Sequence, residues 1–357
     1  MSRPATDAPP ESDAFPNAPH PRFAARLIGH GAAEAAMLAA YREERLAHAW
    51  LIGGREGIGK ATLAWRFARF VLANPDPRAP AVTTARDLSV APDHPAARQL
   101  AALAHPDFAL VRREWNEKAR PKSFFSEIRV DDVRQALSMF HLSAAFGGWR
   151  AVIVDCADDL NATGANALLK MIEEPPPRAL ILILSHRPGQ VLATIRSRCR
   201  RLSLEPLQPD EIETIIAGLG EPWEAIDPAE RRTAAARADG SAREALRRLD
   251  PDATDMGALI DLVIGGLPRP DPDAVHRLAD ALAGRASGEA FAAFSAALLE
   301  WLGARARVAA GPVQQRALAG LWDRVRAAAR ETEALNLDRR LHVLAMFEEI
   351  AGEARRL

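Results

Sequence analysis

Residues 49–72 read AWLIGGREGIGKATLAWRFARFVL, and this stretch decides the fold class. Its first four residues are apolar and predict a short buried strand. From Lys60 onward, Leu63, Phe67 and Phe70 recur along one face of a helix. A glycine-rich turn lies between the two. A buried strand that passes through such a turn into a helix is typical of the units that build a parallel sheet.

Further apolar runs extend this pattern along the chain. Runs at 151–154 and 180–184 predict buried strands, 108–112 and 201–204 are shorter candidates, and the helix pattern at 165–174 is the clearest of those between them. The strands are apolar throughout rather than alternating. We therefore expect an α/β domain whose parallel sheet is covered by helices on both faces.

The composition of the chain changes along its length and predicts its domains. Proline and small polar residues dominate residues 1–20, which we expect to be a disordered tail. The α/β domain spans 21–207, with a surface excursion rich in Pro, Ala and Asp at 73–98. Beyond Pro209 only helical patterns remain. They predict a small helical lid domain at 208–250 and an all-α C-terminal domain at 251–357.

Charge and cysteine content exclude several classes of protein. The 46 basic and 47 acidic residues give a net charge of -1, which argues against a surface built for non-specific nucleic-acid binding. The only two cysteines, Cys156 and Cys199, exclude a disulfide framework and a four-thiolate zinc site. No apolar run approaches the ~20 residues that span a bilayer. We expect a cytoplasmic protein that makes no contact with a membrane.

The glycine-rich turn carries the clearest motif. Gly54, Gly59 and Lys60 match the phosphate-loop pattern G-x-x-x-x-G-K-[ST], and Gly57 lies between them. Glycines in such a loop let backbone N–H groups converge on phosphate oxygens, and the helix N-terminus adds partial positive charge. We expect these four residues to bind ATP or ADP, with Lys60 at the β- and γ-phosphates. The alternative is a plain glycine turn with a solvated lysine.

Two positions depart from the chemistry of an ATPase. Ala61 stands where a Ser or Thr hydroxyl normally binds Mg²⁺, and Thr62, turned by about 100° on the helix, is a poor substitute. Asp155 ends a buried strand, where an acid normally holds Mg²⁺; the alternative is a plain strand-end acid. The next residue, a glutamate in ATPases of the AAA+ class, is Cys156. Loss of a general base removes roughly 10²–10⁴ in rate. We expect weak retention of Mg²⁺ and no bound metal.

Several short motifs resemble one protein family. Residues 151–206 resemble the core of bacterial clamp-loader subunits, and most closely the delta-prime family of DNA polymerase III. The stretches that carry the resemblance are Leu27–His30, His48–Leu51, Asn166–Lys170, Glu173–Pro176, Ser197–Cys199 and Glu331–Asn336.

The resemblance implies a fold, a site and partners. It implies an AAA+ domain, a lid and a C-terminal collar that joins a ring of five with gamma/tau and delta subunits. That ring is part of the DNA-directed DNA polymerase holoenzyme and loads the sliding clamp onto primed DNA in replication. Arg198 would act in trans as an arginine finger on a neighbour's ATP, a role worth about 10³–10⁵ in rate. Arg243 would contact phosphate, and Ser185 would sense the nucleotide.

Other interpretations stay open. A gamma/tau-like ATPase motor has the same fold, but its pattern has GK[ST], an Asp-Glu pair and four zinc-binding cysteines. This chain has Ala61 and Cys156 instead, and no cysteine at 73–105, so we expect no zinc. A stand-alone nucleotide-binding module is a third hypothesis. From chemistry alone, Arg198 would be a solvated surface arginine and Arg243 an exposed helical one.

Overall fold

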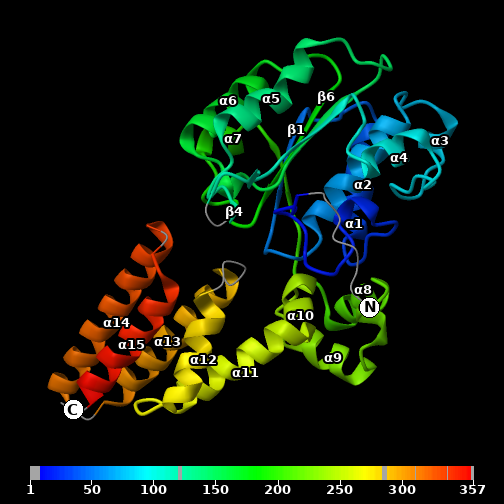
Figure 1. Ribbon diagram of the computed structural model, residues 1–357. Coiled ribbons are helices and arrows are strands. Elements are labelled where there is room, and N and C mark those ends of the chain that lie inside the picture. The colour runs from blue at the N-terminus through cyan, green and yellow to red at the C-terminus, as the bar shows by residue number, and fades with distance from the viewer. Residues whose placement is uncertain (1–8, 120–122, 284–287, 310, 336, 355–357) are drawn as a thin grey trace. The chain divides into compact units, whose positions relative to one another are not determined.

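The computed structural model describes residues 9–119, 123–283, 288–309, 311–335 and 337–354 (Figure 1). The chain divides into two compact units, an N-terminal unit of residues 1–246 and a C-terminal unit of residues 247–357. Most of the segment predicted as a separate lid domain, 208–250, therefore belongs to the N-terminal unit.

The N-terminal unit is built on a sheet of five parallel strands. Their order across the sheet is β2-β5-β6-β1-β7, and every neighbouring pair is parallel. The predicted parallel sheet is confirmed. The strands are β1 (Ala49–Gly53), β2 (Phe108–Val111), β5 (Arg150–Val154), β6 (Ala179–Ser185) and β7 (Arg200–Ser203).

Helices cover both faces of this sheet (Figure 1). On one face lie α1 (Gly31–Arg42) and α2 (Lys60–Ala73), and on the other α5 (Val130–Ser138) and α6 (Ala162–Glu173). Helix α2 begins directly after the glycine-rich turn, as the sequence predicts. Helix α6 begins after Asn161, whose side chain accepts a hydrogen bond from Gly164 N at 2.8 Å and caps the helix.

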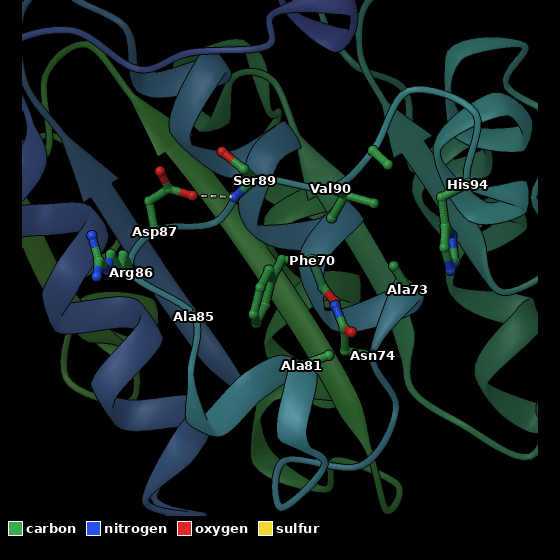
Figure 2. A pocket seen from close by; sticks show the side chains of 11 residues that line it. Phe70, Ala73, Asn74, Ala81, Ala85, Arg86, Asp87, Ser89, Val90 and His94 are labelled. Atoms are coloured by element: carbon green, nitrogen blue, oxygen red, sulfur yellow. Dashed lines mark hydrogen bonds between the residues drawn. The ribbon is translucent and has the colours of Figure 1, made fainter.

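The expected surface excursion at 73–98 is wrong in part, because this segment contributes to the core. Val82 and Leu88 are buried, and the segment contains α3 (Pro80–Thr83) and the start of α4 (Pro95–Ala101). Arg42 of α1 fixes residues 82–85 of this segment by donating hydrogen bonds to the carbonyl oxygens of Val82 and Ala85. An open pocket of about 270 Å³ lies between this segment and the far end of α2, away from the glycine-rich turn (Figure 2).

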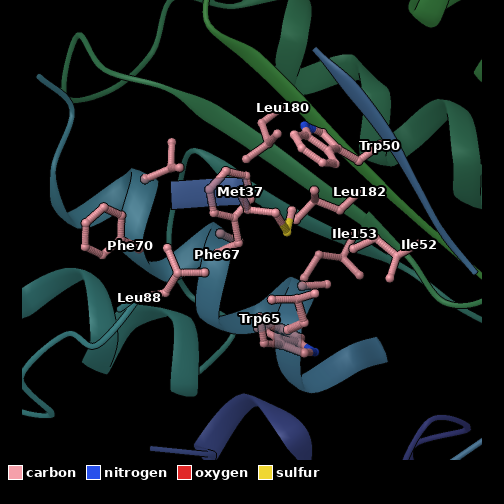
Figure 3. Packing of buried hydrophobic residues seen from close by; sticks show 14 of the residues in the cluster. Met37, Trp50, Ile52, Trp65, Phe67, Phe70, Leu88, Ile153, Leu180 and Leu182 are labelled. Atoms are coloured by element: carbon pink, nitrogen blue, oxygen red, sulfur yellow. The ribbon is translucent and has the colours of Figure 1, made fainter. Parts of the chain in front are cut away.

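The continuous apolar run of β6 is explained by its burial on both faces. Leu180 and Leu182 enter the core cluster beneath α1 and α2, whereas Ile181 and Ile183 enter the cluster beneath α5 and α6. Figure 3 shows the first cluster, in which the two leucines pack with aromatic side chains such as Trp50. A strand that is buried on both faces has no polar position, so its sequence does not alternate.

The structure differs from the expected disordered tail at residues 1–20. Residues 1–8 lie outside the described residues, but the N-terminal segment, residues 9–20, makes specific contacts. Glu11 pairs with Arg22 and Arg112, and Asp13 pairs with His20 and Arg112. The sequence gives no sign of this order because Arg112 is about a hundred residues away.

The remaining helices of the N-terminal unit follow the sheet. The lid helices are α8 (Pro209–Ala217), α9 (Pro228–Ala236) and α10 (Ala242–Leu249), of which α10 extends past the boundary between the units. The shorter elements are η1 (Pro21–Phe23), β3 (Trp115–Asn116), β4 (Ser123–Phe124), η2 (Met139–His141), η3 (Ala157–Asp159), α7 (Ala193–Arg196) and η4 (Trp223–Ala225).

The described part of the C-terminal unit is helical and has its own core. Leu302, Leu321 and Phe347 are buried in it, whereas Leu341 is 61% exposed. No helix among the described residues has the length and apolar composition to cross a membrane. The helices are α11 (Pro251–Gly265), α12 (Pro272–Ala283), α13 (Gly288–Val308), α14 (Pro312–Ala334) and α15 (Arg339–Ala354).

Removal of one buried leucine tests the importance of the two-faced sheet. Leu182 is fully buried in β6, so Leu182→Ala leaves a cavity and should lower the free energy of unfolding of the N-terminal unit by about 2–5 kcal/mol. Leu142, 69% exposed, is the matched control, and Leu142→Ala should change it by less than about 0.5 kcal/mol. Urea denaturation followed by circular dichroism measures both. Equal losses would contradict the assignment of the core.

Candidate functional site

The candidate site lies where the strands end. In a parallel sheet the carboxyl ends of all strands meet at one edge, where open α/β proteins bind their ligands. Here that edge carries the glycine-rich turn after β1, Asp155 after β5 and Ser185 at the end of β6. Gly54 N donates to the Ser185 carbonyl oxygen at 3.3 Å, which joins the turn to β6.

The backbone of the turn requires its glycines. Gly54, Gly57 and Gly59 have φ of +146°, +75° and +108°, a range that other residues rarely adopt. A side chain at Gly57 would also have no room, since its Cβ would lie 2.3 Å from Cβ of Arg243. On the other side, the buried His30 donates from Nε2 to the Ile58 carbonyl oxygen at 2.6 Å. His30 and the loop glycines therefore fix the backbone of the loop.

Lys60 is the buried cation of the turn. It is only 4% exposed, and its Nζ donates hydrogen bonds to the carbonyl oxygens of Gly54 and Arg55 at 2.8 and 2.5 Å. Burial lowers the pKa of Lys60 to about 8, even though the nearby carboxylate of Asp155 opposes this. Burial likewise raises the pKa of Asp155 to about 7, and the carboxylate of Asp13 adds to the effect. The two groups share a site that is poorly solvated.

Asp158 organises the end of β6. Its carboxylate accepts hydrogen bonds from the Ser185 hydroxyl, from His186 N and from Arg187 N at 2.7–3.2 Å. These contacts lower the pKa of Asp158 although burial opposes them. Asp158 thus lies in the first turn of η3 and joins this turn to the end of β6. Ser185, the predicted nucleotide sensor, is fully buried, and its hydroxyl donates a hydrogen bond to the Asp158 carboxylate.

A trio of potential metal ligands lies next to this carboxylate. One ligand atom each from Cys156, Asp158 and His186 lie within 4.8 Å of one another. However, Asp158 already accepts three hydrogen bonds, and the positive charge of Lys60 acts on His186. A cation would have to displace these donors and withstand that repulsion, so the trio does not form a ready metal site.

The lid helices dock directly on the tip of the turn. Ser241 Oγ donates to the Glu56 carbonyl oxygen at 2.8 Å, and Ala242 N donates to the Gly57 carbonyl oxygen at 3.0 Å. Arg243, the predicted phosphate contact, forms a 3.1 Å ion pair with the Glu56 carboxylate. The structure thus brings Arg243 to the turn, beside the loop glycines.

We call the three loop glycines, Lys60 and Arg243 the phosphate cradle. Arg198 lies away from this cradle. It follows α7, its side chain is 43% exposed, and its Nη2 forms a 3.0 Å ion pair with Glu173 at the end of α6. Nη1 also donates to the Thr194 carbonyl oxygen at 3.2 Å. The guanidinium is therefore held in place on the surface of the N-terminal unit.

Two other described residues, His48 of the matched stretch His48–Leu51 and Thr62 of the phosphate-loop helix, make no side-chain hydrogen bond with the phosphate loop, which is itself fully described. His48 Nε2 donates to the Ile172 carbonyl oxygen at 2.9 Å, at the opposite end of β1 from the turn, so it does not border the cradle. Thr62 lies half-buried in the first turn of α2, directly after Ala61.

Sequence reasoning missed the residues that complete the site. Glu56, Asp158 and the N-terminal residues Asp13 and Phe15 all contact or face predicted site residues. Glu56 and Asp158 were visible only as acids close to a motif, and nothing in the sequence indicated their partners.

The geometry defines a class. A phosphate loop between β1 and α2, an acid after β5, and lid helices that place an arginine at the loop tip make this an AAA+ phosphate-loop protein. A model of the family described as DNA polymerase III, delta subunit, matches residues 29–208. The chain belongs to this family, and the resemblance to its delta-prime members is confirmed.

Similar proteins carry related names. The chain is 37% identical over 153 residues to DNA polymerase III subunit delta' of Pseudomonas aeruginosa (43% of this chain, 42% of the relative). It is 29% identical over 170 residues to subunit delta' of Escherichia coli (48% and 46%). It is 28% identical over 268 residues to subunit gamma/tau of Mycobacterium tuberculosis (74% and 43%). The matched stretches span less than half the length of each of these relatives.

Substitution of one loop glycine tests the docking of the lid helices. Gly57→Ala introduces a methyl group where Arg243 lies, whereas Gly147, also at positive φ (+65°), has no atom within 4 Å of the place that a methyl group would take and is the matched control. Gly147→Ala should lower the free energy of unfolding by roughly 1–2 kcal/mol through backbone strain alone. Gly57→Ala should lower it further and expose the Ser241–Arg243 segment to proteolysis. Equal losses in urea denaturation would contradict the docking.

The burial of Lys60 predicts a pH dependence. Its pKa is about 8 in the folded protein against an ordinary 10.5, so between these values the unfolded chain binds more protons. Stability attributable to Lys60 must then rise with pH, by up to about 1.4 kcal/mol per pH unit. The stability difference between wild type and Lys60→Met, measured by urea denaturation from about pH 8 to about pH 10, should shift in favour of wild type. A constant difference would show that Lys60 is solvated.

Proposed function

We propose that this chain is a clamp-loader subunit that does not hydrolyse ATP itself and that offers Arg198 to the ATP site of a neighbouring subunit. The observation that carries the proposal is the combination of an intact loop shape with altered chemistry around it. The cradle of the phosphate loop is complete, while Ala61 and Cys156 stand at the two positions where hydrolysis needs a hydroxyl and a carboxylate.

The cradle fits the phosphates of ATP or ADP. Gly54, Gly57 and Gly59 have the backbone conformations that let loop N–H groups converge, and Lys60 and Arg243 supply positive charge at the loop. A bound nucleotide would take Lys60 Nζ as a donor in place of the carbonyl oxygens that it now contacts.

The surroundings of the cradle do not fit hydrolysis. Ala61 offers no oxygen to Mg²⁺, so we expect a weakly held metal. Cys156 is 5% exposed, and burial raises the pKa of its thiol, so the thiol is protonated at neutral pH and cannot act as a base. We expect no zinc and negligible ATP turnover by the isolated chain.

The surroundings of Arg198 support an action on another subunit. The guanidinium is exposed, has its partners on α6 and α7 and not in the chain's own cradle, and is held by Glu173, so little conformational entropy is lost when it meets a phosphate. A planar cation placed at a developing phosphate charge stabilises the transition state.

The proposed partners follow from the family. They are gamma/tau and delta subunits in a ring of five, joined through the C-terminal unit as a collar, and through the complex the sliding clamp and primed DNA. A gamma/tau-like ATPase motor is the second candidate, favoured by the 268-residue similarity to a gamma/tau subunit. Turnover by the isolated chain separates the two, since a motor subunit hydrolyses ATP in its own site.

Substitution of Arg198 tests the proposed function. In the complex reconstituted with its partner subunits, Arg198→Ala should lower ATP turnover at the neighbouring site by about 10³-fold or more, because the transition-state charge loses its counter-ion. Arg196→Ala is the control, since Arg196 lies two residues away with its guanidinium on the Gly189 carbonyl oxygen. Steady-state ATPase assays on primed DNA and the clamp measure both.

Two results would reject the proposal. Unchanged turnover in the Arg198→Ala complex would remove the role in trans. Robust turnover by the isolated wild-type chain would identify it as a motor subunit.

A further inference from the structure

We propose that the N-terminal segment, residues 9–20, is a built-in competitor of nucleotide: it bridges Arg112 at the carboxyl edge of the sheet and Arg243 of the lid helices, and so crosses the phosphate cradle and keeps it closed. The inference rests on the proposed nucleotide cradle and adds a regulation to it. Its physical content is that nucleotide and the docked segment exclude each other.

The acidic end of the segment is fixed at the carboxyl edge of the sheet. The side chain of Asp13 is only 3% exposed. Its Oδ1 accepts a hydrogen bond from Arg112, which directly follows β2, and its Oδ2 lies 3.0 Å from His20 Nε2. Glu11 pairs with the same Arg112 at 2.8 Å. Strand β2 neighbours β5, so Asp13 lies at the same edge of the sheet as Asp155, near enough for its charge to raise the pKa of Asp155.

The aromatic part of the segment is fixed on the lid helices. The ring of Phe15 lies 5.4 Å from the guanidinium carbon of Arg243 and 5.9 Å from the ring of Trp223. Trp223 Nε1 donates to the Asn17 carbonyl oxygen at 2.8 Å. The segment therefore contacts both the sheet and the lid, and it crosses between the two groups, Asp155 and Arg243, that would flank a terminal phosphate.

Electrostatics makes the docked segment and a nucleotide incompatible. Asp13 brings a buried carboxylate to the edge of the sheet that carries Asp155, where the phosphates of a nucleotide would bring further negative charge. Like charges in a poorly solvated site repel strongly. Arg243 is already engaged by Phe15 and Glu56, and Lys60 by loop carbonyl oxygens. Phosphate must therefore displace the segment and break these contacts before it can bind.

The competition has a predictable size. A site that is open for only a fraction of the time shows an affinity reduced by that fraction. If the segment is docked for about 90–99% of the time, its release should strengthen nucleotide binding about 10- to 100-fold.

The experiment uses the full chain and an ATP analogue with a fluorescent N-methylanthraniloyl group on the ribose. Asp13→Asn combined with Phe15→Ala removes the carboxylate charge and the contact with Arg243. Pro10→Ala, at an exposed position of the same segment, is the matched control. Fluorescence titration should give a Kd at least about tenfold lower for the double variant than for wild type and for Pro10→Ala. Thermal unfolding confirms that all three chains are folded.

Hydrogen exchange supplies a test that needs no variant. Saturating analogue should speed the exchange of amides at residues 9–20 of the wild-type chain, because the segment is released.

Three outcomes would overturn the inference. Equal affinities of wild type and double variant would show that the segment does not compete. Absence of binding by both chains would show that the cradle itself, not the segment, excludes nucleotide. Slower exchange of residues 9–20 with the analogue would show that the segment covers bound nucleotide. None of these bears on Arg198, whose role is tested at a neighbour's site, so failure of either proposal is recognised separately.

Discussion

Burial of both faces of the five-stranded sheet is the constraint on which the rest of the N-terminal unit depends. Helices cover each face, and strands β1, β5 and β6 are buried along their whole length, whereas the edge strand β7 exposes Arg200, Arg201 and Ser203. All strands are parallel, and their carboxyl ends meet at one edge. The phosphate loop, Asp155 and Ser185 are therefore neighbours although they are far apart in the sequence. The topology brings these groups together at one edge, and the side chain at each position decides which ligands and reactions the edge can support.

The edge is a place where charges are balanced inside the chain. Lys60 is satisfied by loop carbonyl oxygens, Arg243 by Glu56, and Asp158 by backbone and hydroxyl donors. These contacts join the loop to α10, and η3 to the end of β6.

The sequence was a good guide to whatever depends on local pattern. The buried strands, the phosphate loop and α2 follow from apolar runs, glycine spacing and helical periodicity, and all are present. Ala61 and Cys156 were recognisable as departures because the motif fixes their positions.

The contacts that complete the site could not be predicted in this way. Ser241 and Glu56 are 185 residues apart, and Asp13 and Arg112 are 99 apart. Pairings of this kind depend on the packed positions of side chains, which no local pattern encodes. The N-terminal segment illustrates the difficulty, because a composition typical of a tail is ordered by a few distant cations and one tryptophan. Asp158 is a second example, because its hydrogen bonds to Ser185, His186 and Arg187 depend on packing and not on a local pattern.

The two buried thiols give the N-terminal unit a pair of native reporters. Cys156 packs in the cluster beneath α1 and α2, and Cys199 packs in the cluster beneath α5 and α6. Burial raises the pKa of both, to about 11 for Cys199, so neither is a ready nucleophile in the folded chain. Alkylation of either thiol then requires the helices that cover it to separate from the sheet. The rates at the two sites would tell whether the layers detach together or one after the other.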